Sequence, residues 1–248
     1  MRSISFFKNG LSAFELKVLA CMFMFIDHIG VMLLPQVGAL RVIGRLAYPL
    51  FAYFIAEGSR YTKNKLKRFL SVFVLGVLCQ IVFVVFAGNG AGNILLTFSV
   101  SILLIYLLMY TKKMMIKSAL IGSVYLVLFV LSLVAAYYCC ELFSLDYGFF
   151  GALTPVLVVA FDDMGEWSDK LYRVIDRKSV SFIMLATGLL CIAMFDATMK
   201  SQIYSLLSLI LLALYNGERG KYSFKYGFYL FYPLHFLGLQ AIRFAIEL

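Results

Sequence analysis

Residues 16–34 read LKVLACMFMFIDHIGVMLL, an apolar run that carries Asp27 and His28 close to its far end. An acid at the middle of a membrane helix costs about 2.5–3.5 kcal/mol on insertion scales. Membrane segments retain such residues where they face a polar cavity, a ligand or a partner side chain. The stretch therefore predicts a membrane span that holds a functional site.

The composition excludes a soluble globular protein. Of the 248 residues, 63% are hydrophobic and 14% are charged, whereas soluble domains average about 45–50% apolar and about 25% charged residues. The net charge of +9 indicates basic cytoplasmic loops in a lipid environment, and no nucleic-acid partner is expected. We expect a single all-α domain over residues 1–248, because too little polar sequence remains for a second, soluble domain.

The apolar runs predict a polytopic transmembrane helix bundle. A span needs about 20 apolar residues, and we identify nine candidates, of which the sixth and eighth are short enough to tilt or re-enter: 14–34, 40–58, 67–87, 93–110, 117–138, 147–162, 180–196, 201–215 and 226–246. Lys and Arg gather in alternate connections, and the intervening PQVGA, GNGAG and ELFSLD hold none. This alternation predicts a cytoplasmic N terminus and an external C terminus.

Several charged or polar residues fall at similar depths in this topology. His28 lies about 9 Å below the outer surface at 1.5 Å per residue, and Arg45 lies at a level similar to Asp27 on the second span. We predict an Asp27–Arg45 pair that bridges the two spans. Arg41 lies one turn before Arg45, and Asn93 opens the fourth span on the same side.

A second histidine, His235, lies near the middle of the ninth span, just after Pro233. Lys17 and His28 are eleven residues apart, so they share one helix face about 16 Å in length. This stripe predicts an elongated ligand with a cytoplasmic phosphate end, which is the shape of an acyl-coenzyme A. The basic loop Arg60–Arg68 lies on the correct side for those phosphates, and His28 is the candidate general base.

Structural interpretations of these residues remain open. The Asp27–Arg45 pair also fits a link between helices, and each histidine also fits a buried ring bonded to a carbonyl. The basic loop is also a topology signal, and GNGAG is typical of a tight turn. The acids of DDMGEWSDKLYRVIDRK match no metal-site spacing, so this segment is interpreted as interfacial and no metal is expected.

Four separated motifs resemble the TraX family: LKVLACMFMFIDHIG, IGRLAYPLFAYFIAEGSRYT, GNILLTFSV and YGFYLFYPLHFLGLQ. That family is similar in plan to acyltransferase-3 membrane enzymes, in which a basic residue is followed after ten residues by His; Lys17 stands where those enzymes commonly have Arg. The resemblance implies a bacterial inner-membrane enzyme that acetylates the N-terminal amine of a conjugative pilin, with acetyl-coenzyme A as donor. The residues that it carries over are Lys17, Asp27, His28, Gly44, Arg45, Pro49, Asn93, Tyr232, Pro233 and His235.

The predicted function is therefore acyl transfer from coenzyme A to an amine. In this hypothesis His28 takes the amine proton, Asp27 holds Arg45, Arg45 and Asn93 stabilise the oxyanion, and His235 carries a proton or orients the substrate. The residues expected to hold the coenzyme are Lys17, Arg41, Arg60, Arg68 and Asn93. Alternatives are glycan O-acetylation, transport, or a structural part of a conjugation machine; oligomeric state is not predicted.

Overall fold

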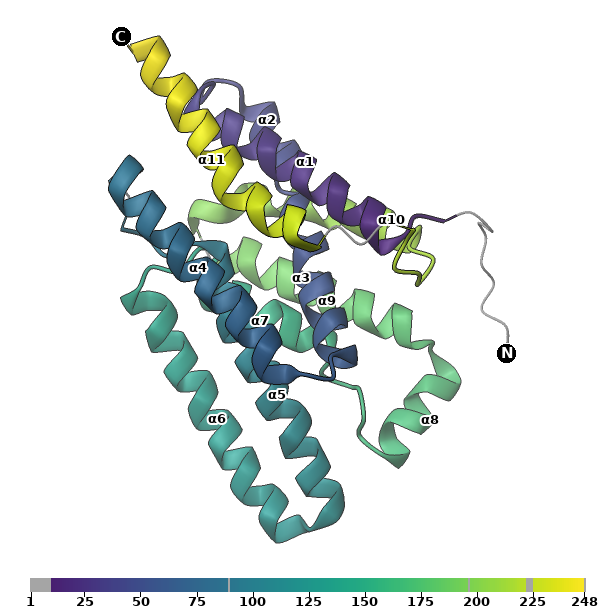
Figure 1. Ribbon diagram of the computed structural model, residues 1–248. Coiled ribbons are helices and arrows are strands. Elements are labelled where there is room, and N and C mark those ends of the chain that lie inside the picture. Colours follow the sequence, from purple (N-terminus) through teal and green to yellow (C-terminus); the bar gives the residue numbers. More distant parts are fainter. Residues whose placement is uncertain (1–9, 89, 196, 222–224, 248) are drawn as a thin grey trace. The chain divides into compact units, whose positions relative to one another are not determined.

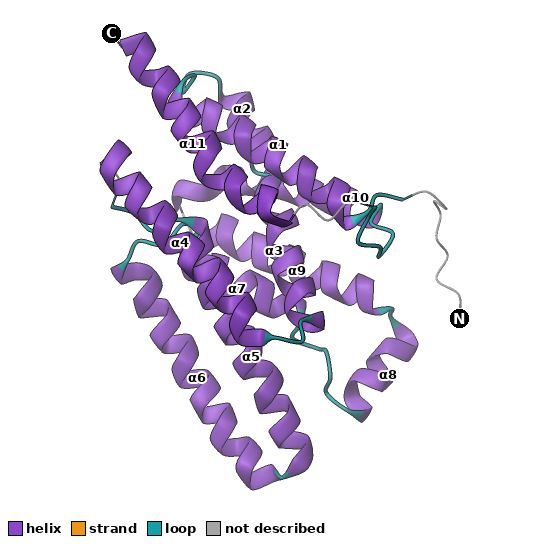
Figure 2. Ribbon diagram, viewed as in Figure 1, coloured by secondary structure: helices purple, strands orange, loops and turns teal. Residues whose placement is uncertain are grey.

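The computed structural model describes residues 10–88, 90–195, 197–221 and 225–247. These residues are mostly helical and form no strand (Figure 2). An isolated bridge joins Leu11 and Tyr215. The all-α prediction is therefore confirmed for the described part of the chain. By their contacts the helices form two units, Met1–Phe54 with Lys200–Leu248 and Ile55–Met199.

The first unit contains α1 (Ala13–Met32), α2 (Gly38–Gly44), the start of α3 (Ala47–Tyr61) and the C-terminal elements. The latter are the 3-10 helix η1 (Ala197–Leu207) from Lys200 onward, α10 (Ser208–Ala213) and α11 (Lys225–Glu247). Helix α1 packs against α2 and α11, so segments from opposite ends of the chain lie side by side (Figure 1). A capping box starts α1: Ser12 Oγ accepts from Glu15 N, and the Glu15 carboxylate accepts from Ser12 N at 2.7 Å.

The second unit contains the end of α3 and six further helices: α4 (Lys65–Ala87), α5 (Ile94–Lys117), α6 (Ala119–Leu142), α7 (Gly148–Val158), α8 (Glu166–Val174) and α9 (Arg177–Phe195). Helix α5 packs against α4, α6 and α7, and α7 packs against α9 (Figure 1). Buried hydroxyls bond to backbone carbonyls, as where Ser101 Oγ donates to Ala152 O at 2.8 Å. Such bonds satisfy polar groups inside an apolar bundle.

Five helical segments among the described residues are long and apolar enough to cross a membrane: Gly38–Tyr61, Lys65–Phe86, Ile94–Lys117, Ala119–Leu142 and Arg177–Phe195. They match five of the predicted spans. The predicted span 14–34 coincides with α1, which carries three charged residues. The predicted spans 147–162 and 201–215 contain only short helices, and 226–246 lies within α11. The total of nine crossings and the orientation stay predictions.

Candidate functional site

Two histidine rings meet where α1 packs against α11. The ring centroids of His28 and His235 are 4.8 Å apart, with an angle of 78° between the planes. His235 is 7% exposed and His28 is half-buried. Each histidine lies within an apolar run of the sequence. The two rings come into contact only because α1 packs on α11.

Backbone carbonyls set the tautomer of both rings. His28 Nδ1 lies 2.8 Å from Met24 O, and His235 Nδ1 lies 2.7 Å from Phe231 O. Because a carbonyl oxygen only accepts, each neutral ring carries its proton on Nδ1 and leaves Nε2 as the basic nitrogen. His235 Nε2 lies 3.5 Å from His28 Nδ1, so it faces the N–H that His28 shares with Met24 O. The remaining basic nitrogen of the pair is His28 Nε2.

Aromatic side chains hold His235 in place. Phe231 stacks on the imidazole at 4.8 Å and 11°, while Tyr232 and Phe25 approach it edge-on at 5.8 Å and 6.4 Å. Pro233 lies within α11 two residues before the histidine. The ring is therefore positioned by packing as well as by its carbonyl bond.

The acid beside His28 forms its ion pair with Arg41 and not, as predicted, with Arg45. Arg41 Nη1 lies 2.6 Å from Asp27 Oδ2. Asp27 Oδ1 is buried without a hydrogen-bond partner among the described residues. Arg45 N donates to Arg41 O at 3.1 Å, so the two arginines follow one helical turn, as predicted. The packing of α2 on α1 brings the Arg41 guanidinium, and not that of Arg45, onto Asp27 Oδ2. Arg45 is 4% exposed.

A glycine permits this close approach of α1 and α2. A Cβ at Gly44 would overlap the Asp27 carboxylate. The His28 ring therefore contacts a second imidazole and follows directly on the acid of the Asp27–Arg41 ion pair.

Lys17, predicted to bind the coenzyme, lies on α1 with its Nζ 5.0 Å from the centre of the Phe54 ring. This contact is a cation–π interaction. The binding stripe from Lys17 to His28 stays a prediction.

Asn93, predicted to stabilise the oxyanion and hold the coenzyme, has a structural role in the second unit. Its Nδ2 donates to Gly76 O at 2.8 Å and to Gln80 Oε1 at 3.0 Å, and its Oδ1 caps α5 by accepting from Leu95 N. The amide is buried and both of its N–H groups are engaged. This arrangement gives no support to the predicted roles.

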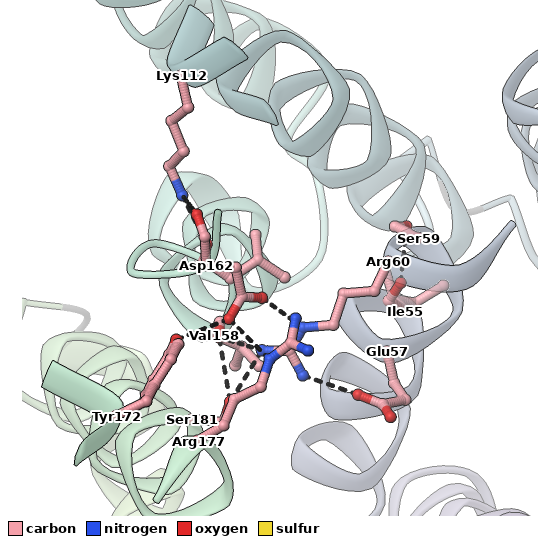
Figure 3. A network of polar contacts seen from close by, with 11 residues as sticks. Ile55, Glu57, Ser59, Arg60, Lys112, Val158, Asp162, Tyr172, Arg177 and Ser181 are labelled. Atoms are coloured by element: carbon pink, nitrogen blue, oxygen red, sulfur yellow. Dashed lines mark hydrogen bonds and ion pairs between the residues drawn. The ribbon is translucent and has the colours of Figure 1, made fainter. Parts of the chain in front are cut away.

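Arg60, also predicted to contact coenzyme phosphates, lies in a buried polar network (Figure 3). Its guanidinium bonds to Asp162 Oδ2 at 2.6 Å, Glu57 Oε2 at 2.7 Å, Val158 O at 2.7 Å and Ser181 Oγ at 2.8 Å. The side chain is 6% exposed. Four protein acceptors therefore occupy the guanidinium, and the predicted role in binding phosphate finds no support.

Asp162, the first residue of the segment predicted to be interfacial, is the centre of this network and is 3% exposed. Arg177 Nε and Tyr172 Oη donate to Asp162 Oδ1 at 3.0 Å and 2.8 Å, and Lys112 Nζ donates to the Asp162 carbonyl at 2.9 Å (Figure 3). Burial and the bond to Asp162 raise the pKa of the Tyr172 phenol to about 12. The sequence feature that could have indicated this network is an acidic residue directly after a short apolar run and close to a segment rich in Lys and Arg.

Arg68, the last predicted coenzyme ligand, donates from Nη2 to Ile55 O at 3.2 Å and packs its guanidinium over Gly58. Its contact with coenzyme stays a prediction. Among the described residues, no group of three or more His, Cys, Asp or Glu side chains is placed to hold a metal ion.

These features define a helical membrane protein with a histidine pair inside its apolar bundle. The family model described as TraX protein matches residues 12–243, and the chain belongs to that family. It is 26% identical to a probable fimbrial assembly protein FimC, serogroup H1, of Dichelobacter nodosus, over 95% of this chain and 97% of the relative. It is also 42% identical to the uncharacterized protein RP591 of Rickettsia prowazekii (strain Madrid E), over 27% of this chain and 25% of that protein. No solved structure matches.

Proposed function

We propose that this chain is a membrane acetyltransferase of pilus or fimbrial assembly, which moves an acetyl group from acetyl-coenzyme A to the N-terminal amine of a pilin-like subunit. Family membership and the relative named as a fimbrial assembly protein support the pilus context. The His28–His235 pair supports the chemistry. We place the protein in the bacterial inner membrane as one domain with nine crossings, a cytoplasmic N terminus and an external C terminus.

His28 is the general base in this proposal. Its Nε2 accepts a proton from the amine as the nitrogen attacks the thioester carbonyl, the carbon–sulfur bond breaks, and the same proton passes to the departing thiolate. The products are an acetamide and free coenzyme A. His235 Nε2 accepts a hydrogen bond from His28 Nδ1–H and so stabilises the ring while it is charged. General acid–base steps of this kind contribute about 10²–10⁴-fold to rates.

The charged cluster beside His28 supplies electrostatic stabilisation. Arg45 carries positive charge close to His28, and Asp27 orients Arg41 through their ion pair. We assign Arg45 to the oxyanion that develops on the thioester carbonyl. An apolar surrounding also favours the neutral, reactive form of the acceptor amine.

The single observation that carries the proposal is that the histidine pair leaves one basic nitrogen, His28 Nε2, outside its internal bonds. The test uses purified protein in detergent with radiolabelled acetyl-coenzyme A and a peptide that has a pilin-like apolar N terminus. We expect acetylated peptide and an equal amount of free coenzyme A, and we expect both to be lost in His28→Ala.

His28→Gln and Cys79→Ala complete the test. Glutamine keeps hydrogen bonding but cannot accept the proton, so His28→Gln should also be inactive, whereas Cys79→Ala should retain activity. Full activity in His28→Gln would favour a structural role, and failure to bind coenzyme A would favour a transporter. Transfer to a sugar hydroxyl but not to the peptide would point to glycan O-acetylation.

A further inference from the structure

A cavity of about 390 Å³ lies in the second unit, where the first residue of α4 and the last turns of α5 meet the connection after α7. Its lining residues are Lys65, Met109, Tyr110, Lys113, Ile116 and Asp163. Lys65 and Lys113 are exposed, and Tyr110 is 44% exposed. Binding sites for small ligands commonly have volumes of about 300–1,000 Å³.

The lining combines four kinds of side chain. The α5 residues 109, 110, 113 and 116 follow helical spacing, so one face of that helix forms a wall of apolar and aromatic groups beside Lys113. Lys65 comes from another helix, and its Nζ is held 5.2 Å from the centre of the Tyr106 ring. Asp163 adds a carboxylate from the connection after α7.

The backbone of Asp163 is in the left-handed region, with a φ of 53°. Residues other than glycine pay a conformational cost there, and such residues are enriched at ligand sites. The strain and the cavity are separate observations on the same residue.

We propose that this cavity binds the nucleoside-phosphate end of the acyl donor. Lys65 and Lys113 pair with the phosphates, Tyr110 stacks on the base, and Asp163 accepts hydrogen bonds from a ribose hydroxyl or an exocyclic amine. Cation pairs are the usual partners of phosphate, stacking of a base on an aromatic ring contributes about 1–3 kcal/mol, and carboxylates bind ribose hydroxyls in dinucleotide sites.

The carboxylate distinguishes a nucleotide from a bare phosphate or a lipid phosphate. Asp163 repels an anion that brings no hydrogen-bond donor, whereas a nucleoside supplies donors to it. Lys65, Lys113, Ile116 and Asp163 lie in the predicted cytoplasmic connections, and Met109 and Tyr110 end the predicted span 93–110 on that side, where a soluble acyl donor would arrive. The inference rests on the proposed function for the identity of that donor.

The test measures binding of adenosine 3′,5′-bisphosphate to the full chain in nanodiscs, without catalysis. We expect Lys65→Gln/Lys113→Gln to lower the affinity about tenfold or more. The matched control Lys63→Gln/Lys117→Gln removes the same charge from the same two segments but does not alter the lining, and it should change the affinity less than about twofold. Equal affinities in the two double variants would overturn the proposal.

Asp163→Gly provides a second variant that should fold, because glycine adopts a positive φ without strain. We expect it to bind the nucleotide more weakly and pyrophosphate more tightly, since the carboxylate no longer repels a bare anion. Equal competition by pyrophosphate in the wild type would overturn the nucleoside assignment. The nucleoside assignment would also be overturned if Lys65→Gln/Lys113→Gln weakened binding to phosphatidylglycerol vesicles but did not change binding of the nucleotide.

The assay of coenzyme A release separates the two proposals. Nucleotide binding that depends on the cavity lysines, in a protein that transfers no acetyl group, would retain the cavity assignment and overturn the proposed function. Acetyl transfer by Lys65→Gln/Lys113→Gln with an unchanged KM for acetyl-coenzyme A would retain the proposed function and overturn the cavity assignment.

Discussion

His235 Nε2 lies 3.5 Å from His28 Nδ1, although 207 positions separate the two residues in the chain. The relationship is asymmetric, because His28 donates and His235 accepts. His28 therefore keeps a basic nitrogen for chemistry, while the Nε2 of His235 is directed at its neighbour. This asymmetry predicts unequal effects of substitution at the two positions.

Replacing His235 by phenylalanine should preserve its packing against Phe231 and remove the nitrogen that faces His28. We expect acetyl transfer to slow by roughly tenfold, against about 10²–10⁴-fold for His28→Ala. Steady-state release of coenzyme A measures both rates, and circular dichroism confirms the folds. If His235→Phe were as slow as His28→Ala, the two rings would have equivalent roles, contrary to this assignment.

Gly44→Ala should destabilise the protein, because its Cβ would overlap the Asp27 carboxylate. Overpacking of this kind costs about 1–3 kcal/mol. Gly38 is the matched control: it lies on the same short helix, and a Cβ there would meet nothing within 4 Å. Gly38→Ala should be neutral or stabilising by up to about 1 kcal/mol. Equal unfolding transitions in detergent for the two variants would contradict the packing of α2 on α1.

Asp162→Asn should strongly destabilise the second unit. The substitution removes the buried carboxylate that Arg60 and Arg177 share and leaves the almost fully buried Arg60 with the partly exposed Glu57. Breaking a buried ion pair costs about 3–5 kcal/mol. Arg173→Gln, which changes an exposed charge on α8, should alter stability by less than about 0.5 kcal/mol. Thermal unfolding and limited proteolysis measure both. A stable Asp162→Asn variant would show that the network contributes little to folding.

Ser205→Ala and Ser208→Ala should each stabilise the protein. Both hydroxyls are fully buried and have no hydrogen-bond partner among the described residues, and a buried unsatisfied polar group costs about 1–3 kcal/mol. Ser101→Ala is the control, since that hydroxyl is equally buried but donates to Ala152 O; it should destabilise by about 1 kcal/mol. The three variants are compared by thermal unfolding. A loss of stability at positions 205 and 208 would mean that those hydroxyls are hydrogen-bonded in the folded protein.

Asp176 predicts a pH-dependent contribution to stability. It precedes α9 and accepts from Ser179 N at 3.0 Å and from Ser179 Oγ at 2.6 Å, and these bonds hold the pKa of its carboxyl below the usual 3.8. A lowered folded-state pKa adds stability above the unfolded-state pKa, and this stability is lost as the pH falls through the folded-state pKa. Asp176→Ala should therefore be less stable than wild type by about 1 kcal/mol at pH 7.

That difference in unfolding free energy should disappear once the pH falls below the lowered folded-state pKa. Asp169→Ala, on the neighbouring helix α8, serves as the control at both pH values. A difference for Asp176→Ala that is the same at neutral and at strongly acid pH would contradict a contribution from the ionised carboxylate.

The chain itself determines the helical membrane character and the family. Long apolar runs must form internally bonded helices in lipid, and this local property predicted the five segments that are long and apolar enough to span. Asp27 and His28 could also be recognised from the sequence as candidate site residues. Burying an ionisable side chain in an apolar run is unfavourable, so such residues are retained mainly where they have a role.

Side-chain partners depended on tertiary structure. The packing of α2 on α1 paired Asp27 with Arg41, and packing between helices that are distant in the sequence paired His28 with His235 and placed Arg60 beside Asp162. Helical periodicity and depth give the position of a residue on its own helix. They do not determine which other helix packs against that residue, or how that helix is rotated about its axis. Those choices arise from the close packing of whole helices, as where the missing Cβ at Gly44 leaves room for the Asp27 carboxylate.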